Sequence, residues 1–116
     1  METPQDVVPS WNPIEVSLKR NEVIEALRTV YDPEIPVNIY DLGLIYDVDV
    51  TPEGVACIQM TLTSPACPAA QSLPGEVEWK VRQVAGIADV QVHVVWDPPW
   101  SMDRMSEEAK LELGLL

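Results

Sequence analysis

The sequence predicts a two-layer α+β domain with its elements in the order αββαβα around a small three-stranded mixed sheet. Three observations lead to this prediction. Apolar residues recur at helical spacing over residues 18–31 and 77–84. They alternate with other residues over 44–50, 55–63 and 90–96, and turn residues separate these segments. We expect the helices to cover one face of the sheet.

The first predicted helix presents its apolar residues largely on one face, and they are Leu18, Val23, Ile24, Leu27, Val30 and Tyr31. Ser17 fits the N-cap of this helix, and Asn12 followed by Pro13 offers an earlier start. Asp32 precedes a proline, which disfavours helical backbone angles, so the helix is predicted to end there.

A hairpin of two half-buried strands follows a loop rich in turn residues. The first strand places Leu44, Tyr46, Val48 and Val50 on one face, and Thr51–Gly54 forms the turn. The returning strand places Ala56, Ile58, Met60 and Leu62 on its apolar face, and Cys57, Gln59, Thr61 and Thr63 on the other. Both strands therefore have one face suited to packing under helices.

The C-terminal half predicts a helix, a strand and a short final helix. Pro74 separates a first helical turn from the main helix, and Gly86 suits the position after its end. In the last strand, Val90, Val92, Val94 and Trp96 alternate with Gln91, His93 and Val95. Ser106 suits the N-cap of the final helix and Gly114 the position after it.

Composition indicates one globular domain and disfavours two classes of partner. A length of 116 residues suits a single domain, which we assign to residues 15–116 after a flexible tail at 1–14. The 19 acidic against 7 basic residues give a charge of −12, which disfavours nucleic acids and anionic membranes. The acidity serves solubility or docking onto a basic partner. No membrane span or secretory signal is evident, so we expect a cytoplasmic protein.

Cys67 is the candidate reactive residue of the chain. Pro68 fits the first position of a helix, which makes Cys67 its N-cap, where N–H groups and the helix dipole favour a thiolate. Thr61 and Thr63 end the preceding strand and offer hydroxyl groups nearby. An inert cysteine in a turn is the alternative. Cys57 lies in mid-strand and suits a structural role. With one histidine in the chain, a four-ligand Cys/His zinc site cannot form within it.

Three acidic residues and two tryptophans complete the candidate site. Asp32 and Asp41 can accept hydrogen bonds from backbone N–H groups in turns, or they can join Glu34 near the sulfur as weak metal ligands or proton handlers. Trp96 and Trp100 flank a rigid Pro-Pro turn. They suit packing, and they also suit a partner-docking surface.

Three motifs together resemble one family, the SufT/PaaD-type (MIP-type) iron–sulfur cluster maturation proteins. They are DPEIPVNIYDLGLIY at 32–46, TLTSPACP at 61–68, and WDPPW at 96–100 with MSEEAK at 105–110. The resemblance runs from about Val23 to the end of the chain. It implies a role in maturing iron–sulfur proteins, with Cys67 as the functional cysteine and Asp32 and Glu34 close to it.

Ligand chemistry limits what this role can be. An iron–sulfur cluster usually takes four ligands, mostly thiolates, and this chain offers one good candidate. A transient cluster or iron ion shared with a second copy, a carrier or a client apoprotein therefore fits better than a cluster held stably by one chain. A metal-free adaptor within the assembly machinery also fits.

Two other classes of function remain open. A thiol enzyme would use Cys67 as a nucleophile, but the sequence shows no evident base for it. An RNA-binding module of the KH type shares the order of elements, but the negative charge and the lack of a Gly-x-x-Gly loop count against it.

Overall fold

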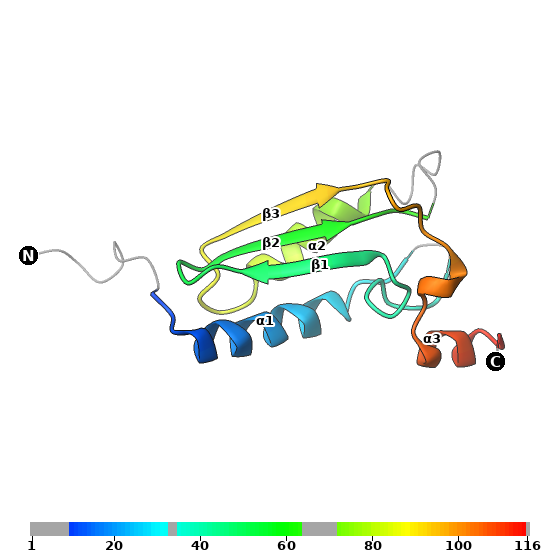
Figure 1. The fold of residues 1–116 in the computed structure, drawn as a ribbon, viewed down its shortest axis with the longest axis horizontal. Helices are drawn as coiled ribbons and strands as arrows, with labels where there is room; N and C mark the ends of the chain where they lie inside the picture. Colours follow the sequence, from blue (N-terminus) through cyan, green and yellow to red (C-terminus); the bar gives the residue numbers. More distant parts are fainter. Residues whose placement is uncertain (1–9, 33–34, 64–71, 116) are drawn as a thin grey trace, which may run out of the picture.

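The computed structural model describes residues 10–32, 35–63 and 72–115 and has the predicted order of elements. The helices are α1 (Pro13–Leu27), α2 (Leu73–Arg82), the 3₁₀ helix η3 (Met102–Arg104) and α3 (Glu107–Glu112), and the strands are β1 (Ile45–Val50), β2 (Val55–Met60) and β3 (Asp89–Val94). The order in the sheet is β1-β2-β3, with β2 antiparallel to β1 and parallel to β3. Helix α1 packs on β1, α2 packs on β3, and both lie on one face (Figure 1). The predicted fold class is confirmed.

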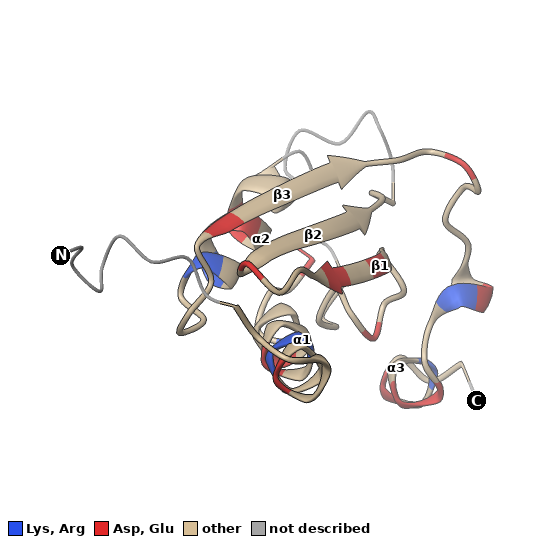
Figure 2. Cartoon of the chain, turned by 60° about the vertical axis from the view of Figure 1, so that its left-hand side comes forward, with Lys and Arg blue, Asp and Glu red and all other residues tan. Residues whose placement is uncertain are grey.

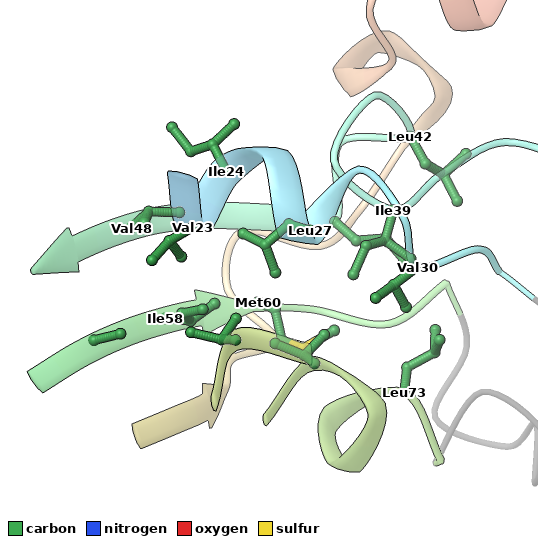
Figure 3. Packing of buried hydrophobic residues seen from close by; sticks show 14 of the residues in the cluster. Val23, Ile24, Leu27, Val30, Ile39, Leu42, Val48, Ile58, Met60 and Leu73 are labelled. Atoms are coloured by element: carbon green, nitrogen blue, oxygen red, sulfur yellow. The ribbon is translucent and has the colours of Figure 1, made fainter. Parts of the chain in front are cut away.

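The hydrophobic core lies between these two helices and the sheet (Figure 3). The helices contribute Val23, Ile24, Leu27, Leu73, Val77 and Val81, and the strands contribute Val48, Val50, Ala56, Ile58, Met60 and Val90. The alternation in the hairpin therefore predicted its buried face correctly except at Tyr46. The pairing is irregular between Ile45 and Asp47, and Ile45 rather than Tyr46 packs against the core. Each fully buried Val, Leu or Ile stabilises the fold by roughly 1.5–3 kcal/mol relative to an exposed position.

Helix α1 begins at the earlier of the two predicted starts. Asn12 is the N-cap, its side chain accepts a hydrogen bond from the N–H of Glu15 at 2.8 Å, and the Glu15 carboxylate accepts from the N–H of Asn12 at 3.0 Å. This is a capping box followed by proline at the first helical position. Residues 12–14, which the sequence assigned to the tail, thus form the cap and first turn. The helix ends at Leu27, earlier than the predicted end at Asp32.

Helix α2 begins at Leu73 and carries Pro74 in its first turn, where the missing N–H is harmless. Its C-cap is Gln83, so Gly86 lies beyond the predicted position, although its φ of +85° has the expected sign. The predicted first turn around Cys67 lies outside the described residues.

After β3 the chain crosses the end of the sheet, and we call residues 95–106 the C-terminal strap (Figure 1). The strap is fixed to the loop that precedes β1. The Ser106 N–H donates to the Asp41 carbonyl at 2.8 Å, and the Trp100 Nε1–H donates to the Leu42 carbonyl at 2.8 Å. Ser106 caps α3, as predicted, by accepting from the Ala109 N–H. No helix among the described residues is long and apolar enough to cross a membrane.

Candidate functional site

The structure describes six of the eight predicted site residues. Cys67 and Glu34 lie outside the described residues. Asp32, Asp41, Thr61, Thr63, Trp96 and Trp100 are described, and they belong to the loop before β1, the end of β2 and the strap. These segments meet at one end of the sheet, because β1 begins where β2 and β3 end. The six described residues therefore come from segments that meet in one region of the fold.

Thr61 follows the last residue of β2 and is completely buried, with 0% exposure. Its N–H donates to the Leu44 carbonyl at 2.8 Å, which extends the pairing between β2 and the start of β1. Its side-chain hydroxyl has no hydrogen-bond partner within the described part of the chain. A buried hydroxyl without a partner costs about 1–3 kcal/mol. Such a group is uncommon, and a native structure that keeps one calls for an explanation.

Asp32 is also buried, with 6% exposure, in the loop between α1 and β1. Its Oδ1 accepts a hydrogen bond from the Ile35 N–H at 3.0 Å, so the carboxylate stabilises its own turn. Accepting a backbone hydrogen bond in a turn is one of the two roles that the sequence predicts for Asp32. Its backbone N–H donates to the Val37 carbonyl at 3.4 Å. The carboxylate is therefore held in one place by the folding of the loop.

Backbone hydrogen bonds connect the loop of Asp32 to the end of β2. Thr61 donates to Leu44, Leu44 donates to Ile39 at 3.1 Å, and Ile39 donates to Val30 at 2.8 Å. Val30 is two residues from Asp32. The fold thus brings the loop of Asp32 and the end of β2 together, although 29 positions separate Asp32 from Thr61 in the sequence.

Asp41 has mainly local partners. Its Oδ2 accepts from the Asn38 side chain at 2.9 Å, and its Oδ1 lies 4.0 Å from the Arg28 guanidinium. The turn itself is stabilised by Asn38, whose Oδ1 accepts from the Asp41 N–H at 2.9 Å. We expected Asp41 in that role, because either residue type favours such turns. Asp41 is occupied by Asn38 and Arg28 and is less suited to act on a substrate than Asp32.

The two tryptophans of the strap differ in their surroundings. Trp100 is partly buried against the core and hydrogen-bonded to Leu42, as described above. Trp96 is 46% exposed. Packing therefore accounts for Trp100, whereas Trp96 leaves a large aromatic surface available to a partner.

An open pocket that the sequence did not predict lies between the strap, the loop before β1 and the start of β1. It has a volume of about 490 Å³ and is lined by Tyr40, Gly43, Ile45, Tyr46, Pro98 and Arg104. The Tyr46 hydroxyl donates to the Pro98 carbonyl at 2.7 Å, and the Arg104 guanidinium lies 4.5 Å from the centre of the Tyr46 ring. The two tyrosines lie in the first motif, but no spacing rule joins them to an arginine about 60 residues away.

Cys57 lies on the face of the sheet opposite the helices. Its sulfur is half-buried, 3.9 Å from the Gln91 side-chain oxygen, and its strand neighbour is Asp49. Within the described ranges, no three His, Cys, Asp or Glu side chains gather closely enough to hold a metal ion. Cys57 is therefore separate from the candidate site at the end of the sheet.

The fold and these site residues define a class of small α+β domains with a cysteine motif after the second strand. Residues 20–94 match the family model described as "Iron-sulfur cluster assembly protein". Because this match covers more than half of the chain, the protein belongs to the iron–sulfur cluster assembly protein family, as its three motifs indicated.

Known relatives agree with this assignment. The chain is 54% identical over 95 residues to an "Fe-S protein maturation auxiliary factor" of Porphyromonas gingivalis, covering 82% of this chain and 90% of the relative. It is 43% identical over 86 residues to the "Fe-S protein maturation auxiliary factor SufT" of Staphylococcus aureus, covering 74% and 98%. A crystal structure of a domain of unknown function from Bacillus anthracis superposes with a TM-score of 0.83 at 39% identity, covering 90% of this chain and all of that one.

Proposed function

We propose that this protein is an accessory factor in the maturation of iron–sulfur proteins, with Cys67 as a transient ligand for iron or for a cluster that is passed to client apoproteins. The observation that carries the proposal is the buried hydroxyl of Thr61, which has no hydrogen-bond partner among the described residues and opens the motif that contains Cys67. A sulfur or oxygen atom of the cargo would accept a hydrogen bond from this hydroxyl and remove the cost of its burial.

The acidic residues of the first motif give the site a preference for a cationic cargo. Asp32 is a buried carboxylate whose loop is tied to Thr61 by backbone hydrogen bonds. A thiolate near Asp32 and Glu34 would be repelled when the site is empty, since all three groups are negative. A bound iron ion reverses this balance, because it stabilises the thiolate and the carboxylates together.

The number of thiolates implies a shared cargo. A cluster usually takes four ligands, mostly thiolates, and Cys67 is the one cysteine of this chain in the matched motif. Further ligands would come from a carrier, a client or a second copy. Such sharing suits transfer, because a cargo held by part of its full ligand set leaves readily. A reducing compartment such as the cytoplasm would keep the thiol available.

The test compares three substitutions in cells that lack the endogenous factor. Cys67→Ser should abolish the support of iron–sulfur client enzymes, and Cys57→Ser should retain it. Thr61→Val keeps the shape of the side chain and removes the hydroxyl, so it should leave the protein as stable as the wild type or more so while reducing client activity. Full complementation by Cys67→Ser would refute the role of this cysteine.

Purified protein distinguishes cargo binding from the two alternatives. After anaerobic incubation with iron and sulfide, native mass spectrometry should show iron and sulfide on dimers or mixed complexes. A monomer that carries a whole cluster would contradict the shared-cargo proposal. Client binding without any metal uptake would indicate an adaptor, and a covalent adduct of Cys67 with a small substrate would indicate a thiol enzyme.

A further inference from the structure

The two edges of the sheet are protected to different degrees. Strands β1 and β3 are the edge strands of the described sheet. An open edge exposes unpaired N–H and C=O groups that attract another strand, and proteins normally block it with charges, bulges or covering segments. The edge of β1 has all three kinds of protection, whereas along the edge of β3 the described residues provide one charge, Asp89 at the first position of the strand.

On β1, the outward-facing carbonyl of Val48 accepts a hydrogen bond from the Arg20 Nε–H of helix α1 at 2.9 Å. Asp47 and Asp49 add two negative charges, and the pairing with β2 is irregular between Ile45 and Asp47. A second strand approaching β1 would meet the arginine, the two carboxylates and the bulge. This edge is closed to further pairing.

On β3, three residues direct their backbone groups away from the sheet. Asp89 and Val95 donate their N–H groups to Gly54 and Met60 of the β2 side, at 3.4 and 2.8 Å. In a parallel ladder alternate residues face the same neighbour, so Gln91 and His93 also face β2. Val90, Val92 and Val94 therefore present their N–H and C=O groups outward, where no described strand pairs with them.

The side chains of β3 suit an additional strand. Asp89 is its one acidic residue, at its first position, and Figure 2 shows the rest of the strand without Lys, Arg, Asp or Glu. Val94 is 37% exposed, and Trp96 just beyond the strand is 46% exposed. A regular strand of six residues, whose one charge lies at its first position and whose last valine is exposed, is the kind of edge that pairs.

We propose that β3 pairs antiparallel with β3 of a second copy, which joins two three-stranded sheets into one of six strands. The symmetric register places Val92 of one copy opposite Val92 of the other and pairs Val90 with Val94. All three outward-facing residues of each copy then form hydrogen bonds, about six in total by the geometry of an antiparallel ladder.

The charges next to this edge do not oppose the pairing with a second copy. In this register Asp89 lies opposite Val95 and Gln91 lies opposite His93, so no like charges face one another. Trp96 lies opposite Ala88, which is exposed and small enough to be covered by an indole. At long range each copy carries −12, so the copies repel one another at low salt. The inference does not depend on the proposed function, because Trp96 is the one candidate site residue that it uses and none of the others, in the loop before β1 or in the cysteine motif, takes part.

Sedimentation velocity on the full chain is the first test. The paired surface is smaller than the roughly 1,200 Å² of a stable interface, so the dimer should be weak and concentrations up to about 1 mM are needed. We expect a reversible dimer that tightens several-fold between about 50 and 500 mM NaCl, since salt screens the repulsion. Val94→Lys should weaken the dimer at least tenfold. Gln59→Lys adds the same charge on the central strand and should not weaken it. A strictly monomeric wild type, or a dimer that Val94→Lys leaves intact, would overturn the proposal.

Proline substitutions test the direction of the backbone groups. Val92→Pro removes an outward N–H, so it should abolish the dimer and leave a folded monomer. His93→Pro removes an N–H that faces β2 and should lower the melting temperature much more. If both prolines are equally harmful to the monomer, β3 does not have the edge that we describe. A dimer unchanged by Val92→Pro would show that another surface forms it, and this result would also overturn the proposal.

Disulfide formation tests the register in a Cys57→Ser, Cys67→Ser background. Gln91→Cys with His93→Cys places each new cysteine about 4.5 Å, between Cα atoms, from its counterpart in the second copy, which suits a disulfide. Gln91→Cys alone lies about 8 Å from its own symmetry mate and should not cross-link. Efficient cross-linking of the single variant, or none of the double variant, would refute the register.

Discussion

Gly43 connects the loop before β1 to the C-terminal strap, and replacing it with alanine should release the strap. The backbone φ of Gly43 is +86°, a conformation that costs an L-residue about 1–2 kcal/mol. A Cβ at this position would lie 2.3 Å from the Arg104 carbonyl oxygen and 2.7 Å from its carbon. Forcing a methyl group into packed structure adds about 1–3 kcal/mol. Gly43→Ala should therefore lower the free energy of unfolding by about 2–5 kcal/mol.

Two other glycines separate the two contributions. Gly114 has a φ of +76°, and an added methyl group would have no atom within 4 Å, so Gly114→Ala should show the backbone cost alone, reduced by its place near the end of the chain. Gly75 lies in α2 with free space around it, so Gly75→Ala should stabilise by about 0.5–1 kcal/mol.

The assay for this series is thermal and urea unfolding followed by circular dichroism and tryptophan fluorescence. At roughly 4 °C per kcal/mol for a domain near 100 residues, Gly43→Ala should melt about 8–20 °C below the wild type. The tryptophan fluorescence of Gly43→Ala should also change, because release of the strap would break the hydrogen bond between the Trp100 indole and the Leu42 carbonyl. If Gly43→Ala costs no more than Gly114→Ala, the close contact with Arg104 does not hold the strap.

Four further substitutions, in two pairs, test other parts of the fold and site. Trp100→Phe keeps an aromatic ring but leaves the Leu42 carbonyl without its donor, so the free energy of unfolding in urea should fall by about 1–3 kcal/mol. Trp96→Ala should change stability little and should weaken the capture of a client or carrier. Unchanged capture would mean that Trp96 has no docking role. Asn12→Ala removes the N-cap of α1 and should lower the free energy of unfolding by about 1 kcal/mol. Ser17→Ala lies inside the exposed part of the helix and should leave the free energy of unfolding almost unchanged. A larger loss for Ser17→Ala than for Asn12→Ala would contradict the observed start of α1.

Much of the fold could be predicted because local patterns and tertiary packing agree in it. The alternation at Val48 and Val50 and from Ala56 to Met60 corresponds directly to the buried face, since a strand has a period of two. The caps at Asn12 and Ser106 were also readable, because their side chains act on their own helices. In each case the residues that carry the signal are close in sequence to the structure they stabilise.

The remaining features depend on contacts between distant segments. Helix α1 was predicted to extend to Asp32 because Val30 and Tyr31 continue its spacing, but Val30 instead accepts a hydrogen bond from Ile39 in the loop before β1. The orientation of Trp100 depends on the Leu42 carbonyl, 58 positions away. The pocket of the strap depends in the same way on Tyr46 and Arg104. A motif indicates that such residues matter, but it does not show which side chains meet.

Under the proposed function, the buried hydroxyl of Thr61 is where stability and function make opposite demands on this fold. Valine has nearly the same shape, would complete the apolar end of β2 and would remove a polar group that no described residue satisfies. Selection for stability alone would therefore favour valine at this position. The threonine sits at the start of the motif that contains Cys67, beside Leu44, whose hydrogen bonds lead to the loop of Asp32. The proposed function accounts for this cost, because a cargo bound beside Thr61 would supply the missing hydrogen-bond partner.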